Sequence, residues 1–149
     1  MPEDPKLEQF RQLVGEWMDP DNKIGRYILD ANGEPVPEPN LFSWGRWLED
    51  SRNDNRRVVA QTDIDSFLVS TVFLALDHNL AARAGIPGAD PRPVLWETMV
   101  FNDYGAVDSR GFTQRYRSRA DAVAGHARVI EEVKAWLAAG MPKEENDDC

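Results

Sequence analysis

The chain has 149 residues and a formal net charge of −9, with 42% hydrophobic and 29% charged residues. This length and composition are typical of one ordinary globular domain. We expect residues 1–142 to form a single domain and residues 143–149 to be an acidic, flexible tail. The negative charge repels nucleic acid at long range, so we expect no nucleic-acid partner. The same charge promotes solubility and also suits a basic protein partner.

Features that bear on cellular location predict the cytoplasm. Cys149 is the only cysteine, so no disulfide can form within the chain, as in proteins of reducing compartments. Residues 1–5 are acidic and polar and lack the basic and apolar regions of a signal peptide. The longest apolar stretch, residues 69–76, is interrupted by Ser70 and Thr71 and is too short to cross a bilayer. We therefore expect no membrane association.

The N-terminal segment, residues 4–18, is predicted to be a helix. Asp4 suits the N-cap and Pro5 suits the first helical position. One apolar stripe then recurs at helical spacing and consists of Leu7, Phe10, Leu13, Val14, Trp17 and Met18.

A short strand is predicted at residues 26–30. A turn follows at residues 31–34, because the Asn-Gly pair there tolerates positive φ. The next segment is predicted to be extended, because it contains Pro35, Pro37 and Pro39.

A second helix is predicted from the N-cap residue Asn40 to about Asp50. Trp44 and Trp47 lie three residues apart within it, and we interpret them as core residues. Residues 51–57 are predicted to be a polar loop.

Two segments that are apolar on both faces, residues 67–76 and 94–101, are predicted to be the central strands of a sheet. Residues 58–64 alternate in polarity and form a further strand. The connection over residues 79–93 is rich in Ala, Gly and Pro and lacks helical periodicity, so we pair the central strands antiparallel. The predicted fold class is α+β, with an antiparallel sheet of about four or five strands and helices packed on it.

The C-terminal region is predicted to contain a short outer strand at residues 113–117 and then a long helix. Ser118 and Asp121 have the spacing of a capping box. One helical face is predicted to consist of Val123, His126, Ile130, Val133 and Leu137. Gly140 and Pro142 end the helix.

Several of these segments resemble a family of small proteins encoded by bacteriophages, prophages and some bacteria. Residues 69–78 read VSTVFLALDH and residues 95–101 read LWETMVF, like the two strand motifs of that family. Three shorter pieces are also similar, and they are residues 26–30, residues 44–49, and Arg115-Tyr116 with the A-x-A-G-H pattern that ends at His126.

The resemblance covers about residues 26–133 and implies no activity, because none is attached to the family. This chain has a longer loop after His78, with residues 81–84 where the family has glycines. The N-terminal helix and the acidic tail lie outside the resemblance.

Four ionisable residues in or near the predicted central strands and the last helix are candidates for an acid–base or metal site: Glu97, His126, Asp77 and His78. Alternation places Glu97 among apolar residues, so its carboxylate needs a partner. His126 lies on the apolar face of the last helix and meets Glu97 if that helix packs on the same face of the sheet. These residue types suit general acid–base chemistry or a divalent metal.

The structural alternative is a buried Glu–His or Glu–Arg pair that fixes packing, with Asp77 hydrogen-bonding its own turn. No HExxH motif, paired metal spacing or nucleophile elbow is present, and no cofactor is predicted. Ser70 and Thr71 lie inside an apolar strand, where we expect their hydroxyls to bond the backbone.

Arg110, Arg115, Arg117 and Arg119 fall within ten residues. Arg115 and Arg117 share one face of a strand, and Arg119 opens a helix, so these three are candidates for binding a phosphate or carboxylate. The structural alternative is a solvated edge strand on which positive charge blocks wrong pairing.

The leading functional hypothesis is a non-catalytic, phage-related protein that binds a protein partner, such as a host or defence component. The acidic balance and the lack of a catalytic signature favour it. The alternatives are a small acid–base or metal-dependent enzyme that uses the Glu/His/Asp cluster, and a homodimer formed through a sheet edge or the N-terminal helix.

Overall fold

The computed structural model describes three stretches of the chain, residues 4–9, 19–107 and 111–141. Contacts group the chain into two compact units. The first unit comprises residues 1–56 and 75–89, and the second comprises residues 57–74 and 90–149. The single domain expected over residues 1–142 stays a prediction, and the acidic tail expected at residues 143–149 lies outside the described residues.

A hairpin in the first unit pairs β1 (Tyr27–Leu29) with β2 (Pro35–Pro37) in antiparallel register. The Asp30 carboxylate accepts hydrogen bonds from the backbone N–H groups two and four residues later, at 2.8 and 3.0 Å. Gly33 has a φ of +79°, a conformation that glycine adopts without steric penalty. The strand, turn and extended segment predicted here are confirmed.

Helix α2 (Leu41–Glu49) follows, and the Asn40 side chain accepts hydrogen bonds from two backbone N–H groups of its first turn, as predicted. The polar loop predicted after it is wrong, because η1 (Ser51–Asn53) and α3 (Asp54–Arg57) occupy those residues. The Asp50 side chain caps this second helical segment by accepting from the backbone N–H two residues later, at 3.0 Å.

A further short helix, α4 (Leu80–Arg83), lies within residues 79–93, where only a loop was expected. The Asn79 side chain caps it, accepting from the backbone N–H three residues later at 3.2 Å. In the N-terminal segment, residues 5–9 are helical as predicted. Residues 10–18 of that predicted helix lie outside the described residues.

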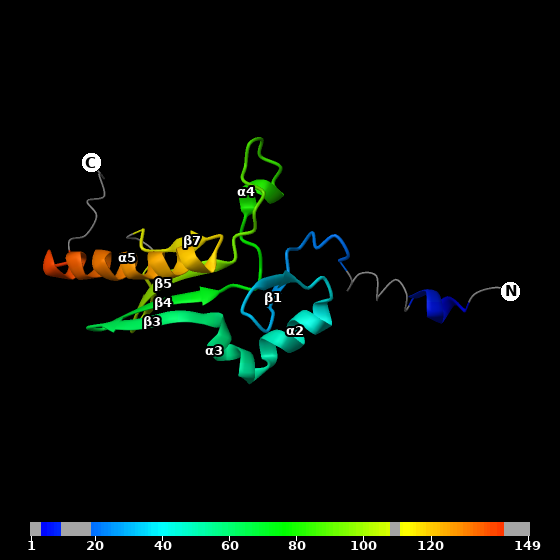
Figure 1. Cartoon of the computed structure of the whole chain (residues 1–149), viewed down its shortest axis with the longest axis horizontal. Coiled ribbons are helices and arrows are strands. Elements are labelled where there is room, and N and C mark those ends of the chain that lie inside the picture. Colours follow the sequence, from blue (N-terminus) through cyan, green and yellow to red (C-terminus); the bar gives the residue numbers. More distant parts are fainter. Residues whose placement is uncertain (1–3, 10–18, 108–110, 142–149) are drawn as a thin grey trace. The chain divides into compact units, whose positions relative to one another are not determined.

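The second unit is built on a five-stranded antiparallel sheet, whose strands are β3 (Val58–Ile64), β4 (Phe67–Phe73), β5 (Trp96–Asn102), β6 (Gly105–Ala106) and β7 (Gln114–Tyr116). The order is β3-β4-β5-β6, and β7 pairs with β5 as well. The two apolar strands are therefore central and antiparallel, as predicted (Figure 1). The α+β fold class is confirmed.

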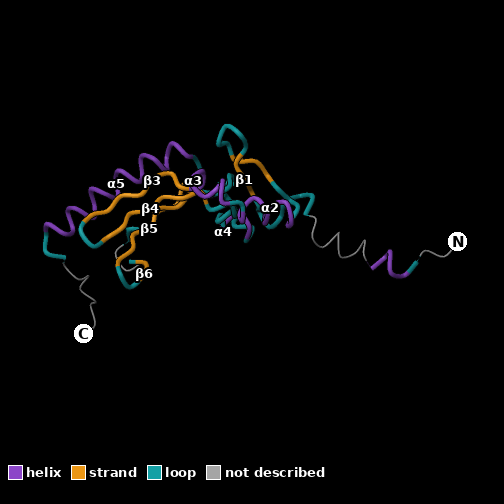
Figure 2. The backbone as a smooth tube through the Cα atoms, turned by 90° about the horizontal axis from the view of Figure 1, so that it is seen from below, coloured by secondary structure: helices purple, strands orange, loops and turns teal. Residues whose placement is uncertain are grey.

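Helix α5 (Arg119–Ala138) lies along one face of this sheet and contacts β3, β4, β5 and β7 (Figure 2). The Ser118 hydroxyl accepts a hydrogen bond from the backbone N–H of Asp121 at 3.1 Å, as the capping-box spacing predicted. The predicted inner face is wrong at Val123, which is 48% exposed. The helix is rotated toward smaller residues that allow a close approach, and its buried face consists of Ala122, Gly125, His126, Val129 and Val133.

The apolar core of the second unit lies between the C-terminal half of α5 and the sheet, and its buried members are Phe67, Val69, Val100, Phe112, Val129 and Val133. The Trp136 ring packs edge-on against the rings of Phe67 and Phe112, with centroid distances of 5.4 and 5.7 Å. Within the described stretches, no helix combines the length and apolarity needed to span a bilayer. Toward the N-terminal half of α5 the same interface becomes polar, and this polar part positions the candidate site.

Candidate functional site

Glu97 and His126 lie on opposite faces of the sheet in the second unit, so the acid–base pair expected from the sequence does not form. His126 projects from α5 and hydrogen-bonds Thr71 of β4, which in turn bonds Thr98 of β5. Successive residues of a strand point to opposite faces, so Glu97, next to Thr98, faces away from α5. The two residues were expected to meet if the last helix packed on the face of the sheet that bears Glu97, and α5 packs on the other face.

Glu97 is instead paired across the strands with Arg115 of β7. The Arg115 Nε–H donates to Glu97 Oε2 at 2.8 Å, and the two residues are direct register partners. The Glu97 side chain is 11% exposed and the Arg115 side chain is 48% exposed. Solvent screening at Arg115 limits the pair to under about 1 kcal/mol of stability. This Glu–Arg pair is the structural alternative considered for Glu97.

Asp77 and His78 belong to the first unit and make local contacts there. Asp77 Oδ1 accepts from the backbone N–H of Asn79 at 2.8 Å, the turn bond expected for it. His78 Nδ1–H donates to the Leu76 carbonyl at 2.7 Å. Among the described residues, no group of three or more His, Cys, Asp or Glu side chains is arranged to hold a metal ion.

His126 is the centre of a hydrogen-bonded chain beneath α5 that sequence reasoning missed. Its Nε2 lies 2.9 Å from Thr62 Oγ1, and its Nδ1 lies 2.8 Å from Thr71 Oγ1. Thr71 Oγ1 lies 2.6 Å from Thr98 Oγ1, which lies 2.9 Å from the hydroxyl oxygen of Tyr116. The expectation that the Thr71 hydroxyl bonds the backbone is therefore wrong, because an α5 histidine lies directly above it.

Burial determines the protonation state of His126 and the position of Tyr116. Desolvation lowers the pKa of His126, so its imidazole is neutral at pH 7. The Tyr116 ring lies against Gly125 of α5, where a Cβ atom would be 2.2 Å from the Tyr116 hydroxyl oxygen. The glycine thus creates the space that lets Tyr116 reach Thr98.

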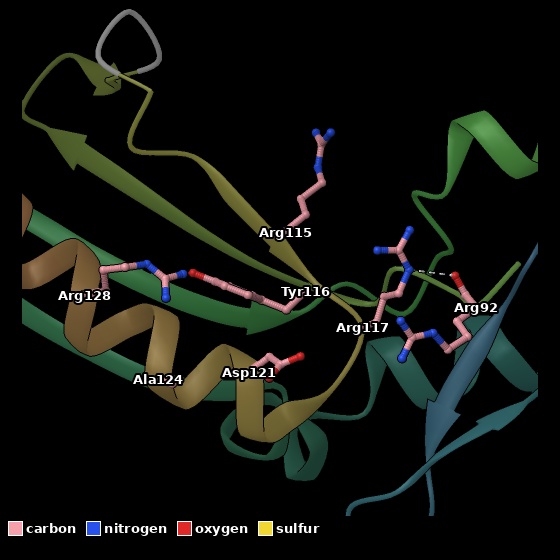
Figure 3. A pocket seen from close by; sticks show the side chains of 7 residues that line it. All are labelled: Arg92, Arg115, Tyr116, Arg117, Asp121, Ala124 and Arg128. Carbon is pink, nitrogen blue, oxygen red and sulfur yellow. Dashed lines mark hydrogen bonds between the residues drawn. The ribbon is translucent and has the colours of Figure 1, made fainter. Parts of the chain in front are cut away.

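Tyr116 also lines a polar pocket of about 300 Å³ on the second unit, and the other lining residues are Arg92, Arg115, Arg117, Asp121, Ala124 and Arg128 (Figure 3). Arg115, Arg117 and Arg119 were predicted to bind an anion together, and of these three only Arg115 and Arg117 line the pocket. As the first residue of α5, Arg119 lies on a different side of the helix from Arg128 and Ala124. We call this feature the arginine pocket.

Two of the pocket arginines, Arg92 and Arg128, were not predicted. Arg128 follows Asp121 by seven residues and Ala124 by four, so helical periodicity places all three on one side of α5 and could have predicted Arg128. Arg92 lies in the irregular segment before β5, and no sequence pattern places it beside β7. The structure does so through the hydrogen bond from Arg117 Nε–H to the Arg92 carbonyl at 3.3 Å.

Acidic neighbours partly compensate the charge of the pocket. Arg92 pairs with Asp90 at 2.6 Å, and Arg117 Nε lies 3.8 Å from the same carboxylate. The hydrogen bonds from Arg92 hold the pKa of Asp90 well below its usual range, so this carboxylate stays ionised. Arg128 has no ion pair with any residue that the structure describes, and it remains a free cation at the pocket.

Comparisons with protein-family models, curated protein sequences and solved structures found no match.

Proposed function

We propose that this chain is a non-catalytic binding protein that recognises an anionic group, a carboxylate or phosphate, carried by a protein partner. The observation that supports this proposal is the arginine pocket, where four arginine residues from three chain segments line one cavity. Guanidinium groups present paired N–H donors that match the oxygens of both anions, and they stay charged at every physiological pH.

The local nature of the pocket is important because the chain as a whole is acidic, with a net charge of −9. Charges beyond the Debye length, about 8 Å at physiological ionic strength, are largely screened. A bound anion therefore interacts mainly with the nearby arginines. Long-range attraction of polyanions such as nucleic acid is unfavourable, which favours a single anionic group on a folded or extended protein partner.

A binding function is also favoured over the acid–base alternative by the contacts of the candidate catalytic residues. The sheet separates Glu97 from His126, and each already has hydrogen-bond partners in the second unit. An acid–base pair has to share one substrate, which these positions do not allow.

The identity of the partner follows only from the resemblance to phage-encoded proteins. On that basis, the partner is a host or phage protein, and inhibition of a host enzyme or defence component is one form of such an interaction.

The direct test is binding to fluorescent peptide pools that are random except for one central residue: serine, phosphoserine, glutamate or lysine. We expect anisotropy at low salt to rise for the phosphoserine or glutamate pool relative to the serine pool. Arg128→Gln abolishes this preference. Arg119→Gln is the matched control, because it removes the same charge from the same helix outside the pocket.

Equal binding of all pools, or an equal loss in both variants, would overturn the proposal. Salt-dependent binding of single-stranded DNA that Arg128→Gln removes would instead assign the pocket to nucleic acid.

A further inference from the structure

The hydrogen-bonded chain that begins at His126 ends in the arginine pocket. Five polar groups follow one another in the order Thr62, His126, Thr71, Thr98 and Tyr116, with separations of 2.6 to 2.9 Å. No other hydrogen bond involves these five side chains among the described residues. Tyr116 is the terminal member and also lines the pocket.

The protons of this chain have only two arrangements that give the proton of the fully buried Thr98 hydroxyl an acceptor. Each hydroxyl has one proton, and the neutral imidazole has one N–H and one bare nitrogen. If Thr71 donates to His126 Nδ1, then Thr98 must donate to Thr71 and Tyr116 to Thr98, and His126 carries its proton on Nε2. We call this the inward arrangement.

If Thr71 instead donates to Thr98, every bond reverses. Thr98 then donates to the Tyr116 oxygen, His126 Nδ1–H donates to Thr71, and Thr62 donates to the bare Nε2. The Tyr116 O–H is released from the chain. In this outward arrangement, its proton is available to the pocket.

What occupies the pocket selects between the two arrangements. Figure 3 shows the Arg128 side chain extending toward the Tyr116 hydroxyl. A guanidinium only donates hydrogen bonds, so it suits the inward arrangement, in which the Tyr116 oxygen offers lone pairs to the pocket. An ionised oxygen of a carboxylate or phosphate only accepts, so it needs the outward arrangement.

We infer that Tyr116 is an anion-contacting residue of the arginine pocket, and that anion binding switches His126 from the Nε2–H to the Nδ1–H tautomer. This inference rests on the proposed anion-binding function. It adds a neutral, directional donor to the arginines, which favours ligands with several acceptor oxygens, such as a phosphate group. It also connects pocket occupancy to Thr62 on β3 without a change of backbone.

The test is ¹H–¹⁵N correlation NMR of the imidazole nitrogens in the full chain at pH 7.5, with inorganic phosphate as the probe and sodium chloride as the ionic-strength control. The chain has two histidines, so His78→Gln assigns the His126 signals. We expect the Nε2–H pattern without phosphate and the Nδ1–H pattern at saturation. In Arg128→Gln the pattern no longer responds to phosphate.

Affinity gives a second measurement. Tyr116→Phe keeps the ring against Gly125 and removes the donor, and we expect it to weaken phosphate binding about tenfold, the usual effect of losing one hydrogen bond to a charged group. Tyr104→Phe is the matched control, because Tyr104 is 99% exposed, and it leaves the affinity unchanged.

The outcomes separate this inference from the proposed function. Phosphate that shifts the Arg117 side-chain resonances while His126 keeps one tautomer would overturn the inference and leave anion binding intact. Phosphate that shifts neither would overturn both. Tyr116→Phe with unchanged phosphate affinity would also reject the inference.

Discussion

Gly125 of α5 and Tyr116 of β7 approach so closely that a single methyl group on Gly125 would lie 2.2 Å from the tyrosine hydroxyl oxygen and its ring. The contact brings the helix onto the strand and directs the hydroxyl toward Thr98. The packing of the second unit and the geometry of the arginine pocket therefore depend on the same glycine.

Gly125→Ala is expected to destabilise the protein by about 2 kcal/mol. Overpacking a core position usually costs about 1–3 kcal/mol, and the higher helix propensity of alanine offsets up to about 1 kcal/mol. Urea denaturation measures the change. Gly45→Ala in α2 is the matched control, because nothing lies within 4 Å of its added methyl group, and it should be neutral or stabilising. Similar effects of the two substitutions would contradict the predicted steric origin.

Thr71→Val is expected to lower the free energy of unfolding by about 1–3 kcal/mol. Valine keeps the shape of the side chain but leaves His126 Nδ1 and the Thr98 hydroxyl without the partner between them. Ser70→Ala on the opposite face removes one bond with the part-buried Gln61 side chain, and it should cost less than about 1 kcal/mol. A larger loss for Ser70→Ala than for Thr71→Val would reject the importance of the buried chain.

Acid should destabilise the protein through His126. Burial lowers the pKa of His126 in the folded state below the ordinary value of 6.5, so the unfolded chain binds more protons as the pH falls. This contribution to stability is fully present above pH 6.5. It is lost as the pH falls from 6.5 toward the folded-state pKa, with a slope of up to about 1.4 kcal/mol per pH unit.

Chemical denaturation at several pH values below 6.5 measures this slope. His126→Gln should flatten the slope in this range, whereas His78→Gln should retain it. An unchanged slope in His126→Gln would assign the acid sensitivity to other groups.

Glu97→Gln is expected to strengthen phosphate binding severalfold with little effect on stability. The substitution removes the negative charge that compensates Arg115, a residue of the arginine pocket. The ion pair contributes little to the stability of the fold, because the Arg115 side chain is exposed to solvent. Glu132→Gln on α5 changes the net charge equally and serves as the control in calorimetric titrations with phosphate. A similar gain in both variants would indicate a general charge effect.

The sequence predicts much of the fold because its signals are local. The strands follow from apolar runs and alternation, and the helix beginnings at Asn40 and Ser118 follow from side chains that bond the next turn. The helices after Asp50 and Asn79 were missed, since short polar helices lack an apolar stripe.

The candidate site was less predictable because it depends on which face of the sheet the helix covers. Alternation separates Glu97 from Thr98, but no local pattern says which of them meets α5. Placing Glu97 under the helix led to the wrong pair, whereas placing Thr98 there leads to the chain from His126 to Tyr116. Arg115 and Arg117 were grouped as candidates because they are close in sequence, whereas Arg92 is distant in sequence and was not considered.

The pairing of β4 with β5 reaches Phe73 and Trp96, and the Leu74 N–H adds one more bond to the Leu95 carbonyl at 2.7 Å. The register of the two central strands is therefore fixed by pairs that lie outside residues 75–89. We expect insertions or deletions within residues 75–89 to leave the pairing of β4 with β5 unchanged. Natural variation in length can accumulate there while the site on the sheet keeps its geometry.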